Sequence, residues 1–571
     1  MSSLPGPTTP AAIATFRHKY CQPGEGYREV CNRVAGAITD DAAHFKAFRE
    51  ILLDGRFVPG GRNLAALGTT KKVTANNCFV SGTIRDSLNG PGSIMDRLAQ
   101  ASRTMQMGGG IGYDFSTLRP RNDFVRSVSS RASGPVSFIH IFDAMGATIS
   151  SEGERRGAQM GVLRVDHPDI EEFIHAKQGE KGLNCFNLSV AVTDEFMKAV
   201  GDGSSFPLVF EGRTYREVDA RTLWDTIMRG TWDWAEPGVL FIDRINEMNN
   251  MGYYETIAAT NPCSEQPLPP FGTCLLGAWN PVRYLRLKSG PTPLGASRYW
   301  FDWAQLLEDI PIVVRAMDNV VDVALYPLEE QGWEAKSTRR MGLGVMGLAN
   351  CLEAQGFPYG VGEFLFAEEQ LLEVIKNTTY IASAGIAKEK GPFPKFDKEL
   401  YLERPFIQGL CQEAQRAIRE HGIRNSHLLT IAPTGTTSLI MDNTSSGIEP
   451  VFAAKARRAV IGPNGVVEHD VVDYGLSVLG VEPKAAADVT AAEHVQVLCV
   501  AQRHVDSAIS KTCNVPSDMP WDAFKGVYMN AWLGGAKGCA TFQEGGMRTG
   551  IIKAVTECEG NKCLISGTIA S

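Results

Sequence analysis

The stretch Asn261-Pro-Cys-Ser-Glu-Gln-Pro-Leu-Pro-Pro-Phe-Gly-Thr-Cys274 decides how the chain is interpreted. It places an amide, a thiol and a carboxylate at alternate positions, on Asn261, Cys263 and Glu265. In an extended backbone alternate side chains point to one face, so we expect these groups to converge. The prolines exclude a helix, and the apolar run that follows, Leu275 to Trp279, predicts a buried strand. The stretch therefore predicts a rigid polar tip inside the protein, the alternative being a surface loop with one buried cysteine.

The bulk composition is that of a globular protein. The 571 residues exceed one typical core, and 44% hydrophobic and 21% charged residues are ordinary values. A net charge of −8 without a basic run argues against nucleic-acid binding. We find no secretory signal and no long apolar stretch, so no membrane span and a cytoplasmic location are expected. The 13 cysteines lack C-x-x-C spacing, which favours reduced thiols over disulfides or a metal site.

Hydrophobic periodicity predicts three regions. Residues 1–70 are expected to be mostly helical, with Asp40 or Asp41 capping a helix that ends at Asp54-Gly55, before a turn at Phe57–Arg62. From Gly161 to Trp333 strand-like and helical segments alternate, and the pattern continues to about Ser438, which predicts βα units around a mostly parallel sheet. Residues 545–571 are expected to form a flexible tail. The predicted strands are 188–192, 239–242, 275–279 and 427–431, and the predicted helices include 222–235, 304–323, 363–389 and 408–420.

Two glycine-containing segments are candidates for ligand contact. Ala432-Pro-Thr-Gly-Thr-Thr-Ser438 offers backbone N–H groups and hydroxyls of the kind that bind phosphate, the alternative being an ordinary capped loop. The run Gly108 to Gly112 lets a backbone approach a ligand closely, or forms a tight turn. The polar segment Ser150–Ala158, with its adjacent arginines, is a solvated charge cluster unless a ligand is involved.

Five thiols stand out from the others. Cys78 begins a predicted strand, and Cys263 and Cys274 belong to the opening stretch. Near the end of the chain, four residues separate Cys558 from Cys563, so this pair is able to close a small disulfide and to exchange with other thiols.

Together these motifs resemble those of ribonucleotide reductase catalytic subunits. Asn261 to Cys274 is similar to the finger loop of that family, usually N-P-C-G-E-Q with a redox cysteine farther on; here Ser264 replaces the usual Gly. Ala432–Ser438 and Thr444–Pro450 resemble the substrate-phosphate segment. Segments 340–347 and 511–516 resemble the adenosylcobalamin-dependent branch, and the resemblance covers roughly residues 55–545.

The resemblance implies a fold and a mechanism. The fold is a ten-stranded α/β barrel of two antiparallel five-stranded halves with a central finger loop, here residues 71–544. Cys263 becomes the thiyl radical that takes the 3′ hydrogen, Glu265 is the base on the 3′ hydroxyl, and Asn261 bonds at the same site. Cys78 and Cys274 supply two electrons and close a disulfide. The tail pair, Cys558 and Cys563, then reduces that disulfide by exchange.

The resemblance also implies binding residues and partners. A ribonucleotide is the substrate, a deoxynucleoside triphosphate is the specificity effector, and a thioredoxin- or glutaredoxin-like protein is the reductant of an expected homodimer. The loop Ser150–Ala158 is expected to link the effector site to the substrate. The substrate-binding residues are Asn77, Gly110, Pro433, Thr434, Gly435, Thr436, Thr437 and Ser438, and the effector-binding residues are Asp86, Ser87, Leu88 and Arg119.

The source of the radical is indicated by what the chain lacks. The branch with a separate radical-generating subunit carries two adjacent tyrosines near the C-terminus, whereas Gly535–Gln543 offers only Phe542. Tyr253-Tyr254 is a pair, but it precedes the finger loop. We find neither a glycyl-radical motif nor the family's ATP-binding activity domain. Adenosylcobalamin is therefore the expected cofactor, and the alternatives are the large subunit of a two-subunit reductase or a catalytically dead nucleotide-binding regulator.

Overall fold

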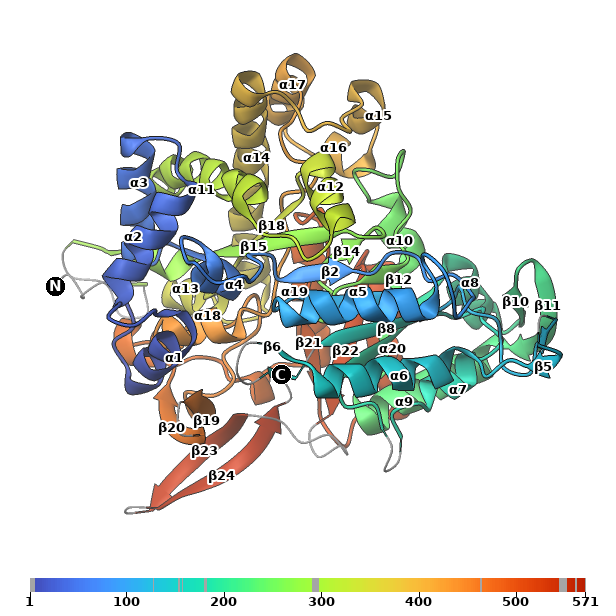
Figure 1. The fold of residues 1–571 in the computed structure, drawn as a ribbon. Coiled ribbons are helices and arrows are strands. Elements are labelled where there is room, and N and C mark those ends of the chain that lie inside the picture. Colours follow the sequence, from blue (N-terminus) through green and yellow to red (C-terminus); the bar gives the residue numbers. More distant parts are fainter. Residues whose placement is uncertain are drawn as a thin grey trace.

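The computed structural model describes residues 6–126, 128–151, 155–156, 158–178, 182–289, 297–462, 465–543, 552–559 and 562–569. Parts of the predicted linking loop Ser150–Ala158, namely residues 152–154 and 157, lie outside the described residues. The fold is a mixed α/β structure built on a large central sheet, with helices packed around it (Figure 1).

The N-terminal region is helical, as predicted. Helices α1 (Pro10–Tyr20), α2 (Tyr27–Ile38) and α3 (Ala42–Leu53) lead into the sheet, with α2 and α3 beside α11 (Trp303–Val323) in Figure 1. Asp41 caps α3 by accepting from the backbone N–H of His44.

The predicted turn at residues 57–62 is wrong in part. Its apolar start is strand β1 (Phe57–Pro59), which pairs with β15 (Thr273–Trp279), and α4 (Gly61–Ala66) follows. All three residues of β1 are buried, so burial of the Phe-Val pair outweighs the turn signal of the Pro-Gly-Gly sequence.

Five neighbouring strands of the sheet run parallel, which confirms the predicted βα organisation. Helices α5 (Ile94–Gln106), α6 (Pro135–Thr148) and α9 (Ala220–Trp234) lie in the connections between them. In order across the sheet these strands are β2 (Cys78–Val80), β3 (Gly110–Asp114), β8 (Gln159–Arg164), β9 (Phe186–Val192) and β12 (Gly238–Phe241).

The second half of the sheet repeats this parallel arrangement. Strand β15 pairs in parallel with β18 (Met341–Val345), and β21 (Thr512–Val515) pairs in parallel with β22 (Gly538–Gln543). The two halves meet antiparallel where β15 lies beside β2 and where β22 lies beside β12.

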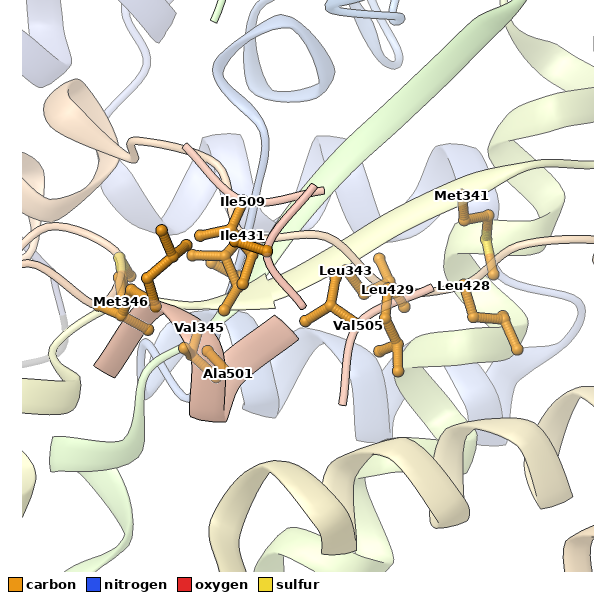
Figure 2. Close-up of a cluster of buried hydrophobic side chains, with 14 of the residues drawn as sticks. Met341, Leu343, Val345, Met346, Leu428, Leu429, Ile431, Ala501, Val505 and Ile509 are labelled. Atoms are coloured by element: carbon orange, nitrogen blue, oxygen red, sulfur yellow. The ribbon is translucent and has the colours of Figure 1, made fainter. Parts of the chain in front are cut away.

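An extended segment, residues 427–431, occupies the place of the predicted strand there. It pairs with β18 through Leu343 and Leu429, and with the segment before β21 through Ile431 and Ile509. Backbone hydrogen bonds support both contacts, from Leu343 N to Leu428 O at 2.8 Å and from Ser510 N to Ile431 O at 2.8 Å. Figure 2 shows the apolar side chains of these segments packed together with those of α19 (Ala491–Gln502).

A short hairpin lies against the first half of the sheet. Its strands are β13 (Ala259–Thr260) and β14 (Pro267–Leu268), and β13 contacts β2, β3 and β8. A Cβ atom at Gly112 would lie 1.8 Å from the carbonyl oxygen of Thr260, so only glycine fits there. At Gly112 the close approach is therefore to another part of the backbone, and ligand contact by the rest of the glycine run stays a prediction.

After β18 the chain forms the remaining predicted helices and a smaller sheet. Helix α14 (Gly362–Lys390) agrees with its prediction, whereas α17 (Gln412–His421) begins later than predicted because α16 (Pro405–Gln408) is a separate turn of helix. Of the helices that the structure describes, none has the length and apolar character needed to cross a membrane.

The smaller sheet contains the described parts of the tail, residues 552–559 and 562–569. It consists of β19 (Lys455–Gly462), β20 (Gly465–Val472), β23 (Ile552–Glu559) and β24 (Lys562–Ile569). Cys558 and Cys563 are directly opposite each other in the β23–β24 hairpin, and β23 also pairs with β19. The flexibility of this tail stays a prediction.

Candidate active site

The tip of the β13–β14 hairpin is a tight turn. Ser264 N donates to Asn261 O at 3.0 Å, and Gln266 N donates to the Asn261 side-chain oxygen at 2.9 Å. Ser264 has a φ of 66°, in the left-handed region that glycine adopts more easily. The extended backbone assumed in the sequence analysis is therefore wrong, because this turn reverses the chain between Asn261 and Glu265.

The turn separates the three polar groups by exposure. Asn261 and Glu265 are each 2% exposed, whereas Cys263 at the apex is exposed. Asn261 Nδ2 donates to Cys78 Sγ at 3.2 Å, and the Cys78 thiol lies 3.8 Å from Glu265 Oε1. The amide and the carboxylate thus meet Cys78, which comes from β2, on the buried side of the tip.

Cys78 and Cys274 are directly opposite each other on β2 and β15, and both carry thiols. Facing residues of antiparallel strands have Cα atoms about 4.5–5.5 Å apart, a separation that a disulfide can span. Both side chains belong to one buried cluster together with residues of the hairpin. The structure therefore brings the two predicted redox cysteines beside the tip.

Burial controls the acid–base properties of the site. It raises the pKa of Glu265 to about 7, and Glu265 Oε2 has no hydrogen-bond partner among the described residues. Burial, followed by the nearby Glu265 carboxylate, raises the pKa of Cys78 well above its usual value. The site thus holds a carboxyl that changes protonation near neutral pH and has one oxygen available to a ligand.

The tip is held by residues from distant parts of the chain. Thr430 Oγ1 donates to Glu265 O at 2.7 Å, and Asn187 Nδ2 donates to Pro262 O at 2.8 Å. A Cβ atom at Gly110 would lie 3.0 Å from Pro262 Cγ. The sequence analysis identified Gly110 but missed Asn187 and Thr430, because no local motif marks them.

The remaining predicted substrate residues form a turn and the start of a helix. Thr434 has a φ of 52°, and α18 (Gly435–Ile440) begins directly after it. Thr434 Oγ1 accepts from Gly447 N at 2.8 Å, so the two predicted phosphate segments contact each other. Arg458, which the sequence analysis missed, donates to Gly435 O at 2.7 Å.

The other members of this group differ in how accessible they are. Thr437 and Ser438 are buried, whereas Pro433 and Thr436 are partly exposed. In the first half of the sheet, Asn77 presents a buried side-chain oxygen that has no partner among the described residues.

The predicted effector residues form a second group. Arg119 donates to the carboxylate of Asp86 and pairs with it. Ser87 Oγ donates to Asn89 O at 3.1 Å, and Leu88 is 50% exposed. The structure therefore joins Asp86 and Arg119, and it places Ser87 and Leu88 in the same loop ahead of α5.

The position expected of a tyrosine relay carries no phenol. Phe542 lies in β22, opposite Asn514 of β21, and is buried. Tyr253 lies in a different part of the chain from Phe542, and its hydroxyl donates to Lys395 O at 3.1 Å.

Comparisons with known proteins agree with the motifs. Residues 76–484 and 482–542 match the family model described as ribonucleotide reductase, barrel domain. The chain is 35% identical to a vitamin B12-dependent ribonucleoside-diphosphate reductase of Mycobacterium tuberculosis, over 94% of this chain and 79% of that protein. It is 34% identical to the protein of that name in Thermoplasma acidophilum, over 90% of this chain and 67% of the relative. A vitamin B12-dependent ribonucleotide reductase of Streptomyces coelicolor is 27% identical, over 84% of this chain and 57% of that protein.

Proposed function

Because this chain belongs to the ribonucleotide reductase family, we propose that it reduces ribonucleotides to 2′-deoxyribonucleotides by thiyl-radical chemistry, with adenosylcobalamin as cofactor. One observation carries the proposal: an exposed thiol, Cys263, stands at the apex of a turn whose buried side joins Asn261 and Glu265 to Cys78.

Each group has a role in this proposal. Cys263, as a thiyl radical, takes the 3′ hydrogen of the ribose. Glu265 accepts the proton of the 3′ hydroxyl through its unpartnered oxygen, and a pKa of about 7 suits a base at neutral pH. Asn261 bonds to the same part of the sugar. Of the three groups, Asn261 and Glu265 are shielded from water, whereas Cys263 is exposed.

The electrons come from the facing thiols. Cys78 and Cys274 together give up two electrons and two protons, and a disulfide forms between them. Their opposite positions on β2 and β15 support this assignment. Cys558 and Cys563 then reduce the disulfide by exchange, and a thioredoxin- or glutaredoxin-like protein reduces the tail. The facing backbone positions of the tail cysteines are compatible with a small disulfide.

The site fits the proposed cofactor because the thiol that must become a radical is accessible from outside the tip. When bound, adenosylcobalamin supplies a carbon-centred radical from its carbon–cobalt bond, the chemistry that a thiol needs to become a thiyl radical. Cys263 is the residue that would face it, because it is the exposed member of the tip while Asn261 and Glu265 are buried. Phe542 has no O–H to lose, so the two-subunit alternative, which needs a tyrosine relay, is not favoured.

The proposal extends to binding and architecture. The turn Pro433–Ser438 and Asn77 and Gly110 bind the substrate, as a diphosphate by analogy with the names of two relatives. Asp86, Ser87, Leu88 and Arg119 bind a deoxynucleoside triphosphate in a homodimer. The ten strands close into a barrel around the hairpin, which is supported by the hydrogen bonds that segment 427–431 makes on both of its sides.

The decisive experiment varies only the cofactor. We expect the purified chain to convert ribonucleoside diphosphates to deoxynucleotides in air with adenosylcobalamin and a dithiol, and to form no product without the cofactor. Parallel reactions with triphosphates test the substrate class. The Cys263→Ala variant is the matched control for background reduction. Activity that requires an added metal-containing subunit would overturn the cofactor assignment, and nucleotide binding without dithiol consumption would favour the dead regulator.

A further inference from the structure

A buried arginine lies beside Cys274 on the inner face of the sheet. In the parallel register of β15 and β18, Leu275 faces Met341, so the preceding residues Cys274 and Arg340 are neighbours. Gly342 identifies the face of the sheet that is turned toward the hairpin. A Cβ atom there would lie 2.4 Å from Gln266 Nε2, in the hairpin, and 2.9 Å from Leu276 Cδ2, on β15. Because alternate residues of a strand share a face, Arg340 lies on this side with Cys274.

The guanidinium of Arg340 has unused donors. Its side chain is fully buried, and one nitrogen donates to Glu255 Oε1 at 2.5 Å. Nε and the other terminal nitrogen have no hydrogen-bond partner within the described parts of the chain. Burying a cation with unsatisfied N–H groups destabilises the folded protein. A function beside the redox thiol Cys274 would explain why Arg340 is found there.

The two facing cysteines therefore differ in the charged group that acts most strongly on each of them. Cys78 is beside the Glu265 carboxylate, which adds to the effect of burial in raising its pKa. Burial also raises the pKa of Cys274, but there Arg340 acts in the opposite direction. The other charged groups that influence Cys274 are Asp506, Glu265 and Glu334, each of which disfavours its thiolate.

We propose that Arg340 is a positioning residue that makes Cys274 the leaving group when the Cys78–Cys274 disulfide is reduced. The inference rests on the redox role given to this pair under the proposed function. A thiolate of the attacking dithiol forms a bond to Cys78 Sγ, the bond between Cys78 and Cys274 breaks, and its electron pair stays on Cys274 beside Arg340. The second thiol of the dithiol then displaces Cys78. Two electrons and two protons move from the dithiol to the pair.

The test follows the disulfide directly, without nucleotide or cofactor. The full chain is oxidised with diamide and mixed with dithiothreitol, and the loss of the disulfide between the Cys78 and Cys274 peptides is followed by rapid alkylation and mass spectrometry. In the Arg340→Gln variant we expect reduction to be roughly three- to tenfold slower at neutral pH, because a leaving thiol of higher pKa leaves more slowly.

A second readout reports which sulfur is attacked, which a purely structural role for Arg340 would not change. With glutathione as the probe, the trapped mixed disulfide should be on Cys78 in the original chain and on both cysteines in Arg340→Gln. The matched control is Arg339→Gln, which removes a neighbouring buried arginine that pairs with Asp318 and Asp322 instead. This control should leave the site of attack on Cys78.

A third variant keeps the inference testable if Arg340→Gln does not fold. Glu255→Gln removes the carboxylate that competes for Arg340, so reduction should become about two- to threefold faster. Unchanged rates in both variants, an unchanged site of attack, or failure of diamide to link Cys78 to Cys274 would overturn the inference. Absence of deoxynucleotide formation by the original chain would overturn the proposed function instead, since the disulfide measurement does not depend on turnover.

Discussion

Replacing Glu265 with Gln should make the protein more stable at alkaline pH while it abolishes the base. Burial raises the pKa of Glu265 from 4.5 to about 7. The folded protein therefore binds this proton more tightly than the unfolded chain does, and the corresponding stability is complete below pH 4.5 and lost as the pH rises to about 7. The difference amounts to at most about 3 kcal/mol, which Gln does not lose because it cannot ionise.

The measurement is thermal unfolding of both proteins at pH 5 and pH 8. For a chain of this size we expect the Glu265→Gln variant to melt a few degrees higher than the original at pH 8, with a much smaller difference at pH 5. Glu353→Gln is the matched control, because burial raises the pKa of Glu353 to about 7 as well, and Glu353 lies on α13 (Leu348–Ala354) rather than at the tip. It should show a similar gain in stability and retain activity.

Activity supplies the second half of this prediction. The ionised form of Glu265 is the base, so kcat/KM of the original enzyme should rise roughly tenfold between pH 6 and pH 8. Glu265→Gln should lose about 10²- to 10⁴-fold at every pH. A flat profile over this range, or a variant that melts lower than the original protein at pH 8, would refute the reasoning, because both results contradict a buried base that ionises near pH 7.

Four further predictions concern the proposed roles. Cys263→Ala should abolish nucleotide reduction while substrate affinity changes little, and appreciable activity in this variant would exclude it as the radical site. Cys274→Ser should stop turnover for lack of electrons, and steady turnover with a dithiol would remove it from the redox pair. Cys558→Ser should slow multiple turnovers driven by a protein reductant far more than a single turnover of pre-reduced enzyme; equal losses would make the tail structural. Asp86→Ala should weaken the effect of deoxynucleoside triphosphates on base preference, typically worth about 1–3 kcal/mol, as measured by competing substrates. A base preference that never responds to effectors would contradict the assignment.

The regular elements were predictable where one pattern dominated. Strands 188–192 and 239–242 are short apolar runs between helical segments, and the structure has β9 and β12 at these places. The strand at 57–59 was missed because Pro59-Gly-Gly carries a strong turn signal, whereas its pairing with β15 is a long-range contact. Segment 427–431 was correctly expected to be extended, although which strands it joins depends on partners far away in the sequence.

The sequence predicted those residues of the candidate site that belong to a local motif, and it did not predict the others. Asn261, Cys263 and Glu265 lie within five residues, and chemistry alone marks them as a group. Asn187 and Thr430 hold the tip through backbone carbonyls, a function that single polar residues in apolar strands do not reveal. Contacts of this kind are fixed by tertiary packing and leave no signature in the local sequence.

The turn explains how neighbouring thiols can serve different purposes. An extended strand would direct Asn261, Cys263 and Glu265 into the same surroundings, whereas the turn at Ser264 leaves Cys263 exposed and buries the other two. A thiol that must become a radical has to be reached by a cofactor, while the thiols that supply electrons must be adjacent to each other and shielded. Cys78 and Cys274 meet the second requirement because neighbouring strands hold them face to face. The left-handed backbone of Ser264 costs about 1 kcal/mol more than it would with glycine. Without this turn, the segment would not hold the radical thiol, Cys263, apart from the buried redox thiols, Cys78 and Cys274.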